Sequence, residues 1–446
     1  MKCIEDEIPF DVPKGWSWAR IFSIADDLPY GTAKKSDKEG KLVVLRMGNI
    51  QSGEIDYKDL VYSSDEEDIA RYSLVPGDLL FNRTNSAEWV GKTAIYRGDI
   101  PCIYAGYLIR VRTHINAEYL NAVMNSGYAK DYCNSVKTDG VNQSNINAQK
   151  LGAFLVPIPP IKEQFRIDAY IAKALPYIQA IAQNKADIAT LVSLTKSRIL
   201  DLAIHGQLVP HNPDDEPASV LLDRIHAEKK DLIKQGIIKQ DKRESVIFRG
   251  EDNSYYLQTG DLIESLSDWE FDELPDTWAV CCLGEICDYG NCINVETDSI
   301  DDDAWILDLE DIEKDTGKVL ARVKKRDRNA ASTKHQFHTG QVLYSKLRPY
   351  LNKVVIADQD GFCTSEIIPL EFEYIVVPEY ARYYLMSPAF LKYANHCSYG
   401  VKMPRLGTAD GKKAIVPLPP YMEQERIAKA IHKAFAKLDS ITESLS

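Results

Sequence analysis

Two short motifs have the residue types of enzyme sites, and neither completes one. Leu418-Pro-Pro-Tyr421 resembles the four-residue signature of amino-methyltransferases. That chemistry needs Asn, Asp or Ser at the first position, to accept a hydrogen bond from the amine that is methylated, and a leucine side chain has no acceptor. No Gly-rich strand–turn–helix for a cofactor precedes the motif. We therefore interpret it as a proline pair that ends a domain.

A second motif has the residues of a metal-dependent nuclease site. Pro213-Asp214 is followed by Glu228-Lys-Lys230 at a spacing that such sites use. Those carboxylates should lie on neighbouring apolar strands. The pattern from Ala218 to Lys234, with Pro217 and acidic residues before it, instead predicts an amphipathic helix. The nuclease interpretation is therefore disfavoured.

Cysteines and histidines supply weak candidates for a metal site. The clustered cysteines are Cys281, Cys282, Cys287 and Cys292. Their spacing differs from the tight pairs of zinc ligands, and the segment predicts a buried strand, in which cysteine behaves as a small hydrophobe. His335 and His338 have no acidic residue nearby at a plausible spacing, so we expect them to be surface or DNA-facing histidines. We predict no catalytic site, and no metal or cofactor bound by the chain itself.

The elements that must position any site occur twice. Val156-Pro-Ile-Pro-Pro160, followed by Glu163-Gln164, returns 260 residues later as Val416-Pro-Leu-Pro-Pro420, followed by Glu423-Gln424. Further matches occur in the same order with nearly the same offset. A period this long excludes a solenoid and indicates a domain duplication. The copies differ in the segments that follow strands, as two recognition modules with different targets would.

Each copy has the pattern of a mixed α/β domain. Short β-rich runs bounded by Gly, Pro and Asp predict strands, and each copy ends at a proline-rich stop. The predicted strands of the first copy are Lys41–Leu45, Asp78–Phe81, Thr93–Tyr96 and Tyr107–Val111, and helices are predicted near Ala117–Ser126 and, in the second copy, Glu379–Met386. The predicted fold class is α+β, with two duplicated α/β domains separated by long helices.

After each proline-rich stop comes a helix with apolar residues three and four positions apart. The seam positions are Ile171, Ile178, Ile181, Ile188 and Val192 after the first copy, and Ile427, Ile431, Leu438 and Ile441 after the second. Such a run is long enough for a coiled coil, and the alternative is that each stripe packs on its own domain. Pro176 should kink or interrupt the first helix, but it leaves the seam from Ile178 onward intact.

Composition excludes several classes of protein. The chain has 446 residues, of which 45% are hydrophobic and 27% charged, and this indicates a globular protein of two or three units. It has no apolar run long enough to span a membrane, and Met1–Phe10 is acidic without an apolar core. Its nine cysteines lack framework spacing. We therefore expect a cytoplasmic protein.

Net charge alone does not decide whether nucleic acid is a partner. The formal charge of −13 argues at first against one. The acid is concentrated in residues 251–315, including Asp301–Asp303, and a basic run follows at Arg322–Arg328. Local basic loops can bind phosphates in a protein that is acidic overall, so DNA binding is not excluded.

The chain also resembles a known family, the DNA specificity subunit of type I restriction–modification systems. The resemblance is carried by the two proline motifs with their Glu-Gln pairs and by the segments Ile199–Pro210, Asp214–Ser219, Arg224–Lys229 and Val246–Tyr256. It implies two target recognition domains that alternate with two helical regions, which pair as an antiparallel coiled coil. The implied boundaries are 1–158 and 251–418 for the recognition domains, and 159–250 and 419–446 for the helical regions.

The resemblance further implies a function and partners. Each recognition domain would read half of a split site in double-stranded DNA, methyltransferase subunits would bind the helices, and a motor–nuclease subunit would join the complex. S-adenosylmethionine, ATP and Mg²⁺ would be bound by those partner subunits. Two alternatives come from other classes: an enzyme that fuses methyltransferase and specificity activities, and a protein scaffold that does not bind DNA.

Polar side chains of the divergent loops are the candidates for DNA contacts. Arg and Lys suit guanine, and Asn and Gln suit adenine, while phosphate contact or a solvated loop is the alternative at each position. In the first copy the candidates are Asn82, Arg83, Thr84, Asn85, Lys92, Asn142, Gln143, Ser144 and Asn145. In the second copy they are Lys324, Lys325, Arg326, Ser345, Lys346, Arg348, Tyr350, Lys353, Lys402 and Arg405. We expect Arg348 in particular to read a base, because Pro349 presets the backbone beside it.

Overall fold

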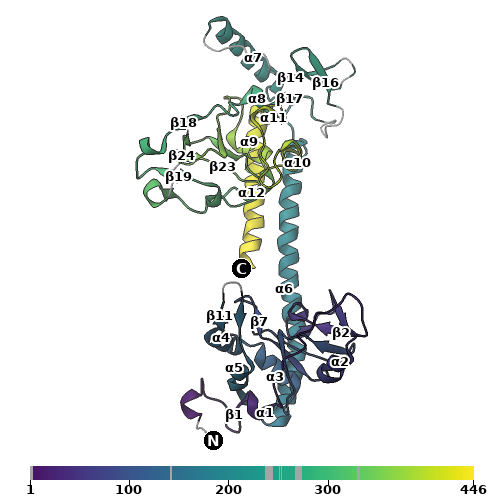
Figure 1. Ribbon diagram of the computed structural model, residues 1–446. Coiled ribbons are helices and arrows are strands. Elements are labelled where there is room, and N and C mark those ends of the chain that lie inside the picture. The colour runs from purple at the N-terminus through teal and green to yellow at the C-terminus, as the bar shows by residue number, and fades with distance from the viewer. Residues whose placement is uncertain are drawn as a thin grey trace. The chain divides into compact units, whose positions relative to one another are not determined.

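The computed structural model describes residues 4–140, 143–236, 245–250, 252, 254–266, 274–328 and 332–445 (Figure 1). By its internal contacts the chain divides into unit 1, from Met1 to Ala182, and unit 2, from Gln183 to Ser446. Each unit combines short strands with helices, which confirms the predicted α+β class.

Unit 1 brings its first and last strands together. β1 pairs antiparallel with β13, so both ends of the domain meet where helix α6 begins. β2 pairs in parallel with β9, and β6 lies between β10 and β8 in another sheet. The strands are β1 (Ser17–Arg20), β2 (Leu42–Leu45), β3 (Ile50–Gln51), β4 (Glu54–Ile55), β5 (Val61–Ser63), β6 (Leu79–Asn82), β7 (Thr84–Asn85), β8 (Thr93–Ile95), β9 (Cys102–Tyr104), β10 (Leu108–Val111), β11 (Thr138–Asp139), β12 (Ser144–Asn145) and β13 (Leu155–Ile158). The helices are α1 (Ile21–Ile24), α2 (Glu66–Tyr72), α3 (Ala117–Met124), α4 (Gly127–Val136), α5 (Ala148–Ala153) and the start of α6 (Ile161–Ile204).

Unit 2 repeats this order of elements, which confirms the duplication. β17 pairs with β26 as β1 does with β13, β19 pairs in parallel with β24 as β2 does with β9, and the order β23-β22-β25 matches β8-β6-β10. The strands are β14 (Ser245–Arg249), β15 (Tyr255–Thr259), β16 (Leu262–Ser265), β17 (Ala279–Cys282), β18 (Ile293–Val295), β19 (Trp305–Leu307), β20 (Val323–Lys324), β21 (Lys334–Phe337), β22 (Val342–Ser345), β23 (Val354–Ile356), β24 (Gly361–Thr364), β25 (Ile367–Leu370) and β26 (Ile415–Leu418). The helices are α7 (Ala218–Lys234), α8 (Leu283–Ile286), α9 (Pro378–Leu385), α10 (Pro388–Cys397), α11 (Thr408–Lys412) and α12 (Tyr421–Ser444).

The central strand of each copy is buried on both faces. Leu79 and Phe81 of β6 belong to one hydrophobic cluster, and Leu80 between them belongs to another. In β22, Tyr344 and Leu343 likewise belong to two different hydrophobic clusters. Because successive side chains of a strand point to opposite faces, one strand joins two cores, and the loop that follows it is held firmly.

Much of the expected central helical region belongs to unit 2. Leu200 and Ile204 of α6 and Leu222 of α7 lie in the same hydrophobic cluster as Trp278. The boundary implied at residue 250 falls between β14 and β15, which are paired strands of one sheet. The structure therefore attaches the segment before residue 250 to the rest of unit 2, because strand pairing and burial cross the implied boundary.

A buried glutamine explains the repeated Glu-Gln motif. Oε1 of Gln164, in the first turn of α6, accepts the N–H of Asn116 at 3.0 Å, just before α3 begins, and its Nε2 donates to the carbonyl of Pro159 at 2.8 Å. In unit 2, Gln424 accepts the N–H of Val377, just before α9, at 2.8 Å. One side chain thus joins the start of each long helix to the start of a domain helix.

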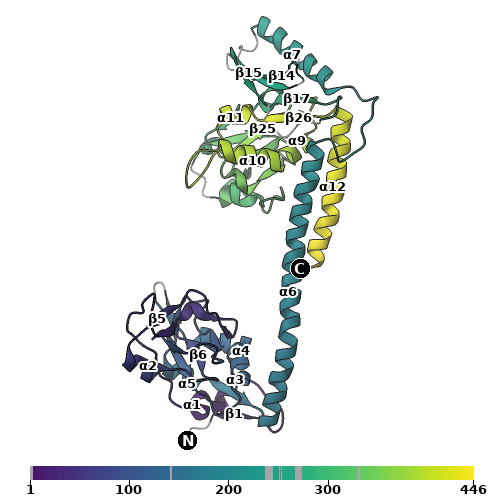
Figure 2. The ribbon, with the colours of Figure 1, turned by 90° about the vertical axis from the view of Figure 1, so that its right-hand side faces the viewer.

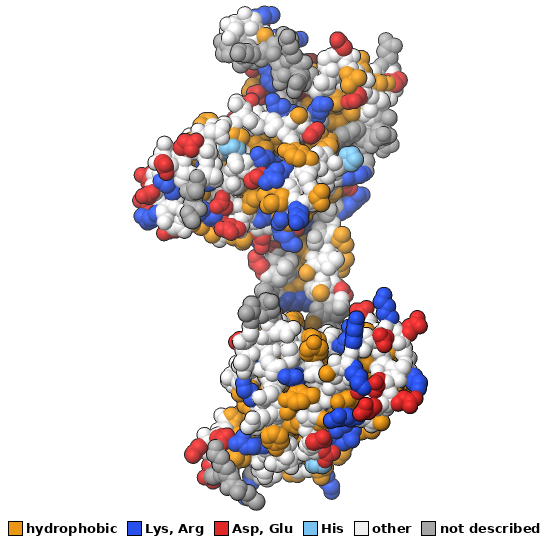
Figure 3. Space-filling model, in the orientation of Figure 1, with side chains coloured by type: hydrophobic (Ala, Val, Ile, Leu, Met, Phe, Trp, Pro, Cys, Tyr) orange, Lys and Arg blue, Asp and Glu red, His pale blue; other side chains and the backbone are white. Residues whose placement is uncertain are grey.

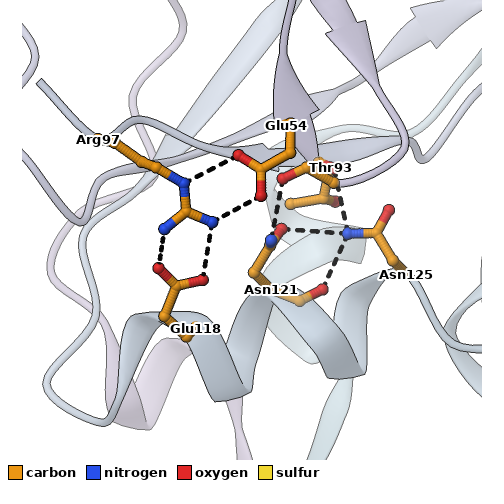
Figure 4. Close-up of polar contacts among 7 residues, drawn as sticks. Glu54, Thr93, Arg97, Glu118, Asn121 and Asn125 are labelled. Atoms are coloured by element: carbon orange, nitrogen blue, oxygen red, sulfur yellow. Dashed lines mark hydrogen bonds and ion pairs between the residues drawn. The ribbon is translucent and has the colours of Figure 1, made fainter. Parts of the chain in front are cut away.

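A second polar network fixes α3 to the strands of unit 1 (Figure 4). The guanidinium of Arg97 bridges the carboxylates of Glu54 and Glu118. Nδ2 of Asn121 donates to the carbonyl of Gly53 at 3.0 Å, and Nδ2 of Asn125 donates to the carbonyl of Thr93 at 3.1 Å. In unit 2, Arg382 of α9 donates to the carbonyl of Thr316 in the same way.

In unit 2, the last part of α6 and α12 lie side by side and antiparallel (Figures 1 and 2). Nζ of Lys196 lies 2.5 Å from Oδ1 of Asp439 and 5.2 Å from the centre of the Phe435 ring. The seam positions Val192, Ile427 and Ile431 are buried, Ile171, Ile188 and Leu438 are half-buried, and Ile178, Ile181 and Ile441 are exposed. Ile427 and Ile431 are also part of the core of unit 2, so the helix seam and the domain core are continuous there.

We expected Pro176 to kink or interrupt the helix, and it does not interrupt it, because α6 runs without a break through this residue. The side chains around it are exposed, so water can bind the carbonyl that loses its hydrogen bond to the proline. None of the helices that the structure describes is both long and apolar enough to cross a membrane.

We predict that Gln424→Ala lowers the free energy of unfolding by about 2–4 kcal/mol, because it leaves a buried N–H and two buried carbonyls without partners. Urea unfolding followed by circular dichroism measures this loss. Hydrogen exchange of the Val377 amide should also become faster.

Glu425→Ala is the matched control, because it removes only a surface pair with Lys429 and should change stability by less than about 0.5 kcal/mol. Equal urea midpoints for the two variants would contradict a stabilising role of Gln424.

Candidate nucleic-acid interface

The structure brings the two polar clusters of the first copy together. β7 pairs with β12, so Thr84 lies opposite Asn145, 61 positions away in sequence, and β11 pairs with the other side of β12. We call residues 83–85, 106–107 and 143–145 the polar edge of unit 1.

Arg83 is the central cation of this edge. Its guanidinium lies 4.5 Å from the centre of the Tyr30 ring. Its terminal nitrogens donate to the carbonyl of Gly106 at 3.3 Å and to Oδ1 of Asn145 at 3.4 Å, which are long distances. A base edge or a phosphate could therefore replace these weak partners while the aromatic ring still supports the guanidinium.

Three of the predicted contact residues of the first copy are buried. Asn82 is 0% exposed, and neither atom of its amide has a partner in the part of the chain that the structure describes. The hydroxyl of Thr84 accepts a hydrogen bond from Asn145 at 2.7 Å, and Ser144 donates to Asp139 at 2.5 Å. For these three the structure corrects the expectation of exposed loop side chains, because the strands enclose them.

The remaining candidates of the first copy differ in exposure. Oδ1 of the half-buried Asn85 accepts the N–H of Ser86 at 2.8 Å, and Gln143 is exposed. Asn142 lies outside the described residues.

Two candidate lysines occupy equivalent positions and are partly enclosed. Nζ of Lys92 lies 3.8 Å from the centre of the Trp89 ring and donates to Gln51 at 3.1 Å. Nζ of Lys353 donates to the carbonyl of Leu309 at 2.5 Å. Burial lowers the pKa of both amines. Each lysine is therefore tied to its own domain before any ligand binds.

Unit 2 has the same edge with different side chains. Lys346 follows β22 as Arg83 follows β6. Its N–H donates to the carbonyl of Glu366, and its carbonyl accepts the N–H of Leu406. The guanidinium of Arg405 forms a side-on pair with the carboxylate of Glu366, with Nε at 3.1 Å from both oxygens and Nη2 at 2.8 Å from one of them. Ser345, by contrast, is buried and donates to the carbonyl of Leu347. We call residues 346–348, 365–366 and 399–405 the polar edge of unit 2.

Arg348 has the preset backbone that we predicted, but its side chain is half-buried. Its φ is +50°, its N–H donates to the carbonyl of Pro404 at 2.7 Å, and Pro349 begins a short 3-10 helix. Its Nε is enclosed without a partner among the described residues. Tyr350 and Lys402 are exposed.

The basic run of the second copy is neutralised by the acidic run. Lys324 and Arg326 both pair with Asp303, at 2.8 and 2.9 Å, and Lys325 pairs with Asp302 at 3.0 Å. These residues meet because β20 pairs with β19, which begins just after the acidic residues. In Figure 3 acidic side chains concentrate over β18, β19 and β24, whereas basic and apolar side chains lie together nearer to β23.

Residues of the motifs that resemble catalytic sites are buried or hydrogen-bonded within unit 2. Leu418 lies buried on β26, and Glu228 on α7 accepts a hydrogen bond from Tyr374 at 3.3 Å. Cys281 and Cys282 lie on β17, as the predicted buried strand requires. Within the described ranges, no group of three His, Cys, Asp or Glu is placed to hold a metal ion.

The two histidines near β21 differ in exposure. His335 is 8% exposed, with Nδ1 at 2.9 Å from the carbonyl of Ile367, and burial lowers its pKa. The expectation of a surface histidine is therefore wrong for His335. It holds for the exposed His338, whose Nε2 lies 2.8 Å from Glu371.

Sequence reasoning missed Tyr30, Tyr107 and Glu366. Tyr30 supports Arg83 from a distant segment, and Tyr107 and Glu366 lie just before β10 and β25 and accept the matching backbone hydrogen bonds. Aligning the copies strand by strand would have placed Tyr107 opposite Glu366. The constant offset hides this match, because the loops between the strands differ in length.

Comparison with known proteins identifies related sequences. Residues 275–446 match the family model of the type I restriction modification DNA specificity domain. The chain is 24% identical over 290 residues to the type I restriction enzyme EcoDI specificity subunit of Escherichia coli, and this match covers 65% of this chain and 60% of that protein. It is 32% identical over 164 residues to the putative type I restriction enzyme MjaX specificity subunit of Methanocaldococcus jannaschii, covering 35% of this chain and 39% of that protein. The match spans less than two thirds of each relative.

The fold is similar to that of a chain in a solved structure that concerns complex assembly and conformational transition of the type I R-M system. The TM-score is 0.62 at 15% identity, over 98% of this chain and 94% of that chain. At this identity the likeness concerns the fold alone. The second copy, with the helix that follows it, is thus similar in sequence to the type I restriction modification DNA specificity domain, and the whole chain shares the fold of the solved structure.

Proposed function

We propose that this chain is the DNA-recognition subunit of a type I restriction–modification complex. The observation that carries the proposal is one scaffold present twice, with the same backbone hydrogen bonds at both polar edges and different side chains on them. Two such readers suit a split DNA target, in which each unit reads one half-site and the spacer between them is unread.

The side chains of the two edges support reading of DNA. Arg83 and Asn145 in unit 1, and Arg405 in unit 2, carry the donors and acceptors that base edges recognise. The exposed Lys402 and Gln143 suit phosphate or sugar, which position a protein without reading sequence. Because the acidic and basic runs of unit 2 pair with each other, the acidic composition does not oppose DNA at the edge itself.

An exposed apolar stripe on α6 supports protein partners. In unit 1, Tyr170, Tyr177, Ile178 and Ile181 are between 61% and 75% exposed. Apolar side chains at helical spacing favour a protein surface over DNA. We assign methyltransferase subunits to this stripe and a motor–nuclease subunit to the assembled complex, in keeping with relatives that are named as subunits of restriction enzymes.

In this proposal the chain carries no catalytic site of its own. Methyl transfer and DNA cleavage, with S-adenosylmethionine, ATP and Mg²⁺, belong to the partner subunits, and the complex acts in the cytoplasm. S-adenosylmethionine binding by the purified chain in equilibrium dialysis would favour the fused-enzyme alternative. Absence of DNA binding by the assembled complex would favour the scaffold alternative.

The proposal predicts that recognition is separable. If residues 1–158 are exchanged for those of another family member, one half-site should change and the other should stay the same, because each edge is built within its own unit. Mapping of modified adenines in the DNA of cells that express the exchanged chain measures this. A change in both half-sites would show that the units do not read independently.

If the apolar stripe binds a partner, a substitution in it should impair assembly of the complex without destabilising the fold. Ile178→Asp should leave the free energy of unfolding within about 0.5 kcal/mol, because the side chain is exposed, but it should abolish co-purification with methyltransferase subunits. Val192→Asp should instead destabilise unit 2 by several kcal/mol, because a charge would be buried.

Gln179→Asp, at an exposed polar position of the same helix, adds the same charge and is the control. The assignment of the stripe fails if Ile178→Asp and Gln179→Asp retain the partner equally on a sizing column.

A further inference from the structure

The two polar edges share a backbone frame that pairs their residues one to one. The N–H of Arg83 donates to the carbonyl of Tyr107, and that of Lys346 to the carbonyl of Glu366, each at 3.0 Å. The carbonyl of Arg83 accepts the N–H of Ile146 at 2.9 Å, and that of Lys346 accepts the N–H of Leu406 at 3.0 Å.

This frame places Arg405 where unit 1 has Asn145. Asn145 pairs with Thr84 in a strand ladder, and Arg405 forms a β-bridge with Leu347. Tyr107 and Glu366 correspond in the same way. Side chains thus differ where the backbone is the same, and this is the pattern that two readers with different targets require.

Three hydrogen bonds fix the orientation of the Arg405 guanidinium and leave part of it free. Its Nε–H and one N–H of Nη2 are directed to the carboxylate of Glu366, and one N–H of Nη1 to the carbonyl of Met403 at 3.2 Å. A guanidinium has five N–H groups, so one remains on each terminal nitrogen. The side chain of Arg405 is 33% exposed, so these two donors can reach a ligand.

The segment before Arg405 forms an exposed turn of unit 2. Tyr399 and Arg405 bond to each other through both backbones, which closes a turn. Gly400 has φ of +104°, and an added Cβ would lie 3.1 Å from the carbonyl of Met403, so the turn requires glycine. Val401 and Lys402 at its tip are exposed. A small apolar tip with one cation, beside a fixed guanidinium, fits a DNA groove.

We propose that Arg405, positioned by Glu366, reads a guanine in the half-site that unit 2 binds. The two remaining N–H groups match O6 and N7 of guanine, which are adjacent acceptors in the major groove. Because Glu366 holds the fork in place, less side-chain entropy is lost on binding. This inference rests on the proposed function. It favours Arg405 over Arg348, whose guanidinium has no such carboxylate among the described residues and whose Nε is enclosed.

The test is selection from a randomised duplex library by the full-length chain, purified with its bound subunits. The unaltered protein should select a bipartite consensus. Arg405→Ala should lose one guanine from one half-site and leave the other half-site unchanged. On single duplexes, the preference for that guanine should fall by about 5- to 150-fold, which corresponds to 1–3 kcal/mol.

Three further variants separate reading from a merely structural ion pair. Arg405→Lys keeps the charge but not the fork, so it should retain affinity while its preference for the guanine weakens. Glu366→Gln should relax the same position while thermal stability changes little. Lys402→Ala, which removes an exposed cation nearby, should weaken binding equally on all sequences with a shallower salt dependence.

An unchanged consensus for Arg405→Ala, with affinity lowered uniformly, would overturn the inference and leave Arg405 as a phosphate contact. A guanine preference as strong in Arg405→Lys as in the unaltered protein would overturn the role assigned to the fork and to Glu366. If the unaltered protein selects no consensus at all, the proposed function fails and not this inference alone.

Discussion

The long helices of this protein depend on a single buried hydrogen-bonding side chain at each start. Gln164 and Gln424 accept a backbone N–H just before α3 and α9, respectively, and both are almost fully buried. An unpaired buried N–H is costly, so the direction in which α6 or α12 leaves its domain cannot change without breaking these bonds. Within each unit, the start of the long helix is therefore fixed relative to the domain that carries the polar edge.

Unit 2 has a further polar network at the start of α12. The fully buried carboxylate of Glu423 lies 2.8 Å from Nδ1 of His211 and accepts a hydrogen bond from Trp278 at 3.1 Å. Arg426 pairs with Asp215 at 2.6 Å. The segment between α6 and α7 is thus held against the start of α12, which accounts for the motif residues around Asp214–Ser219. A buried carboxylate is tolerated only when it is hydrogen-bonded, so this segment is an integral part of unit 2.

Charge is arranged locally in this acidic chain. Asp302 and Asp303, just before β19, pair with basic residues of β20 and of the turn after it. Pairs of this kind contribute little stability at the surface, but they remove charge that would repel DNA. Arg405 uses a carboxylate differently: Glu366 neutralises only one side of the guanidinium, and the other side keeps its donors.

The duplication, the class of fold, most strand positions and the long helices could be predicted from the sequence, because they depend on local periodicity and on proline stops. The sequence also shows which loops differ between the two copies, since divergence after β6 and β22 is visible in the repeat. Only the tertiary structure decided which side chains face out of those loops. It buried Asn82 and His335, paired the basic run with the acidic run, and joined Arg405 to Glu366, 39 positions away. Such pairs depend on strand order and register, which local sequence patterns do not encode, because each strand can pair with several partners until the whole core is packed.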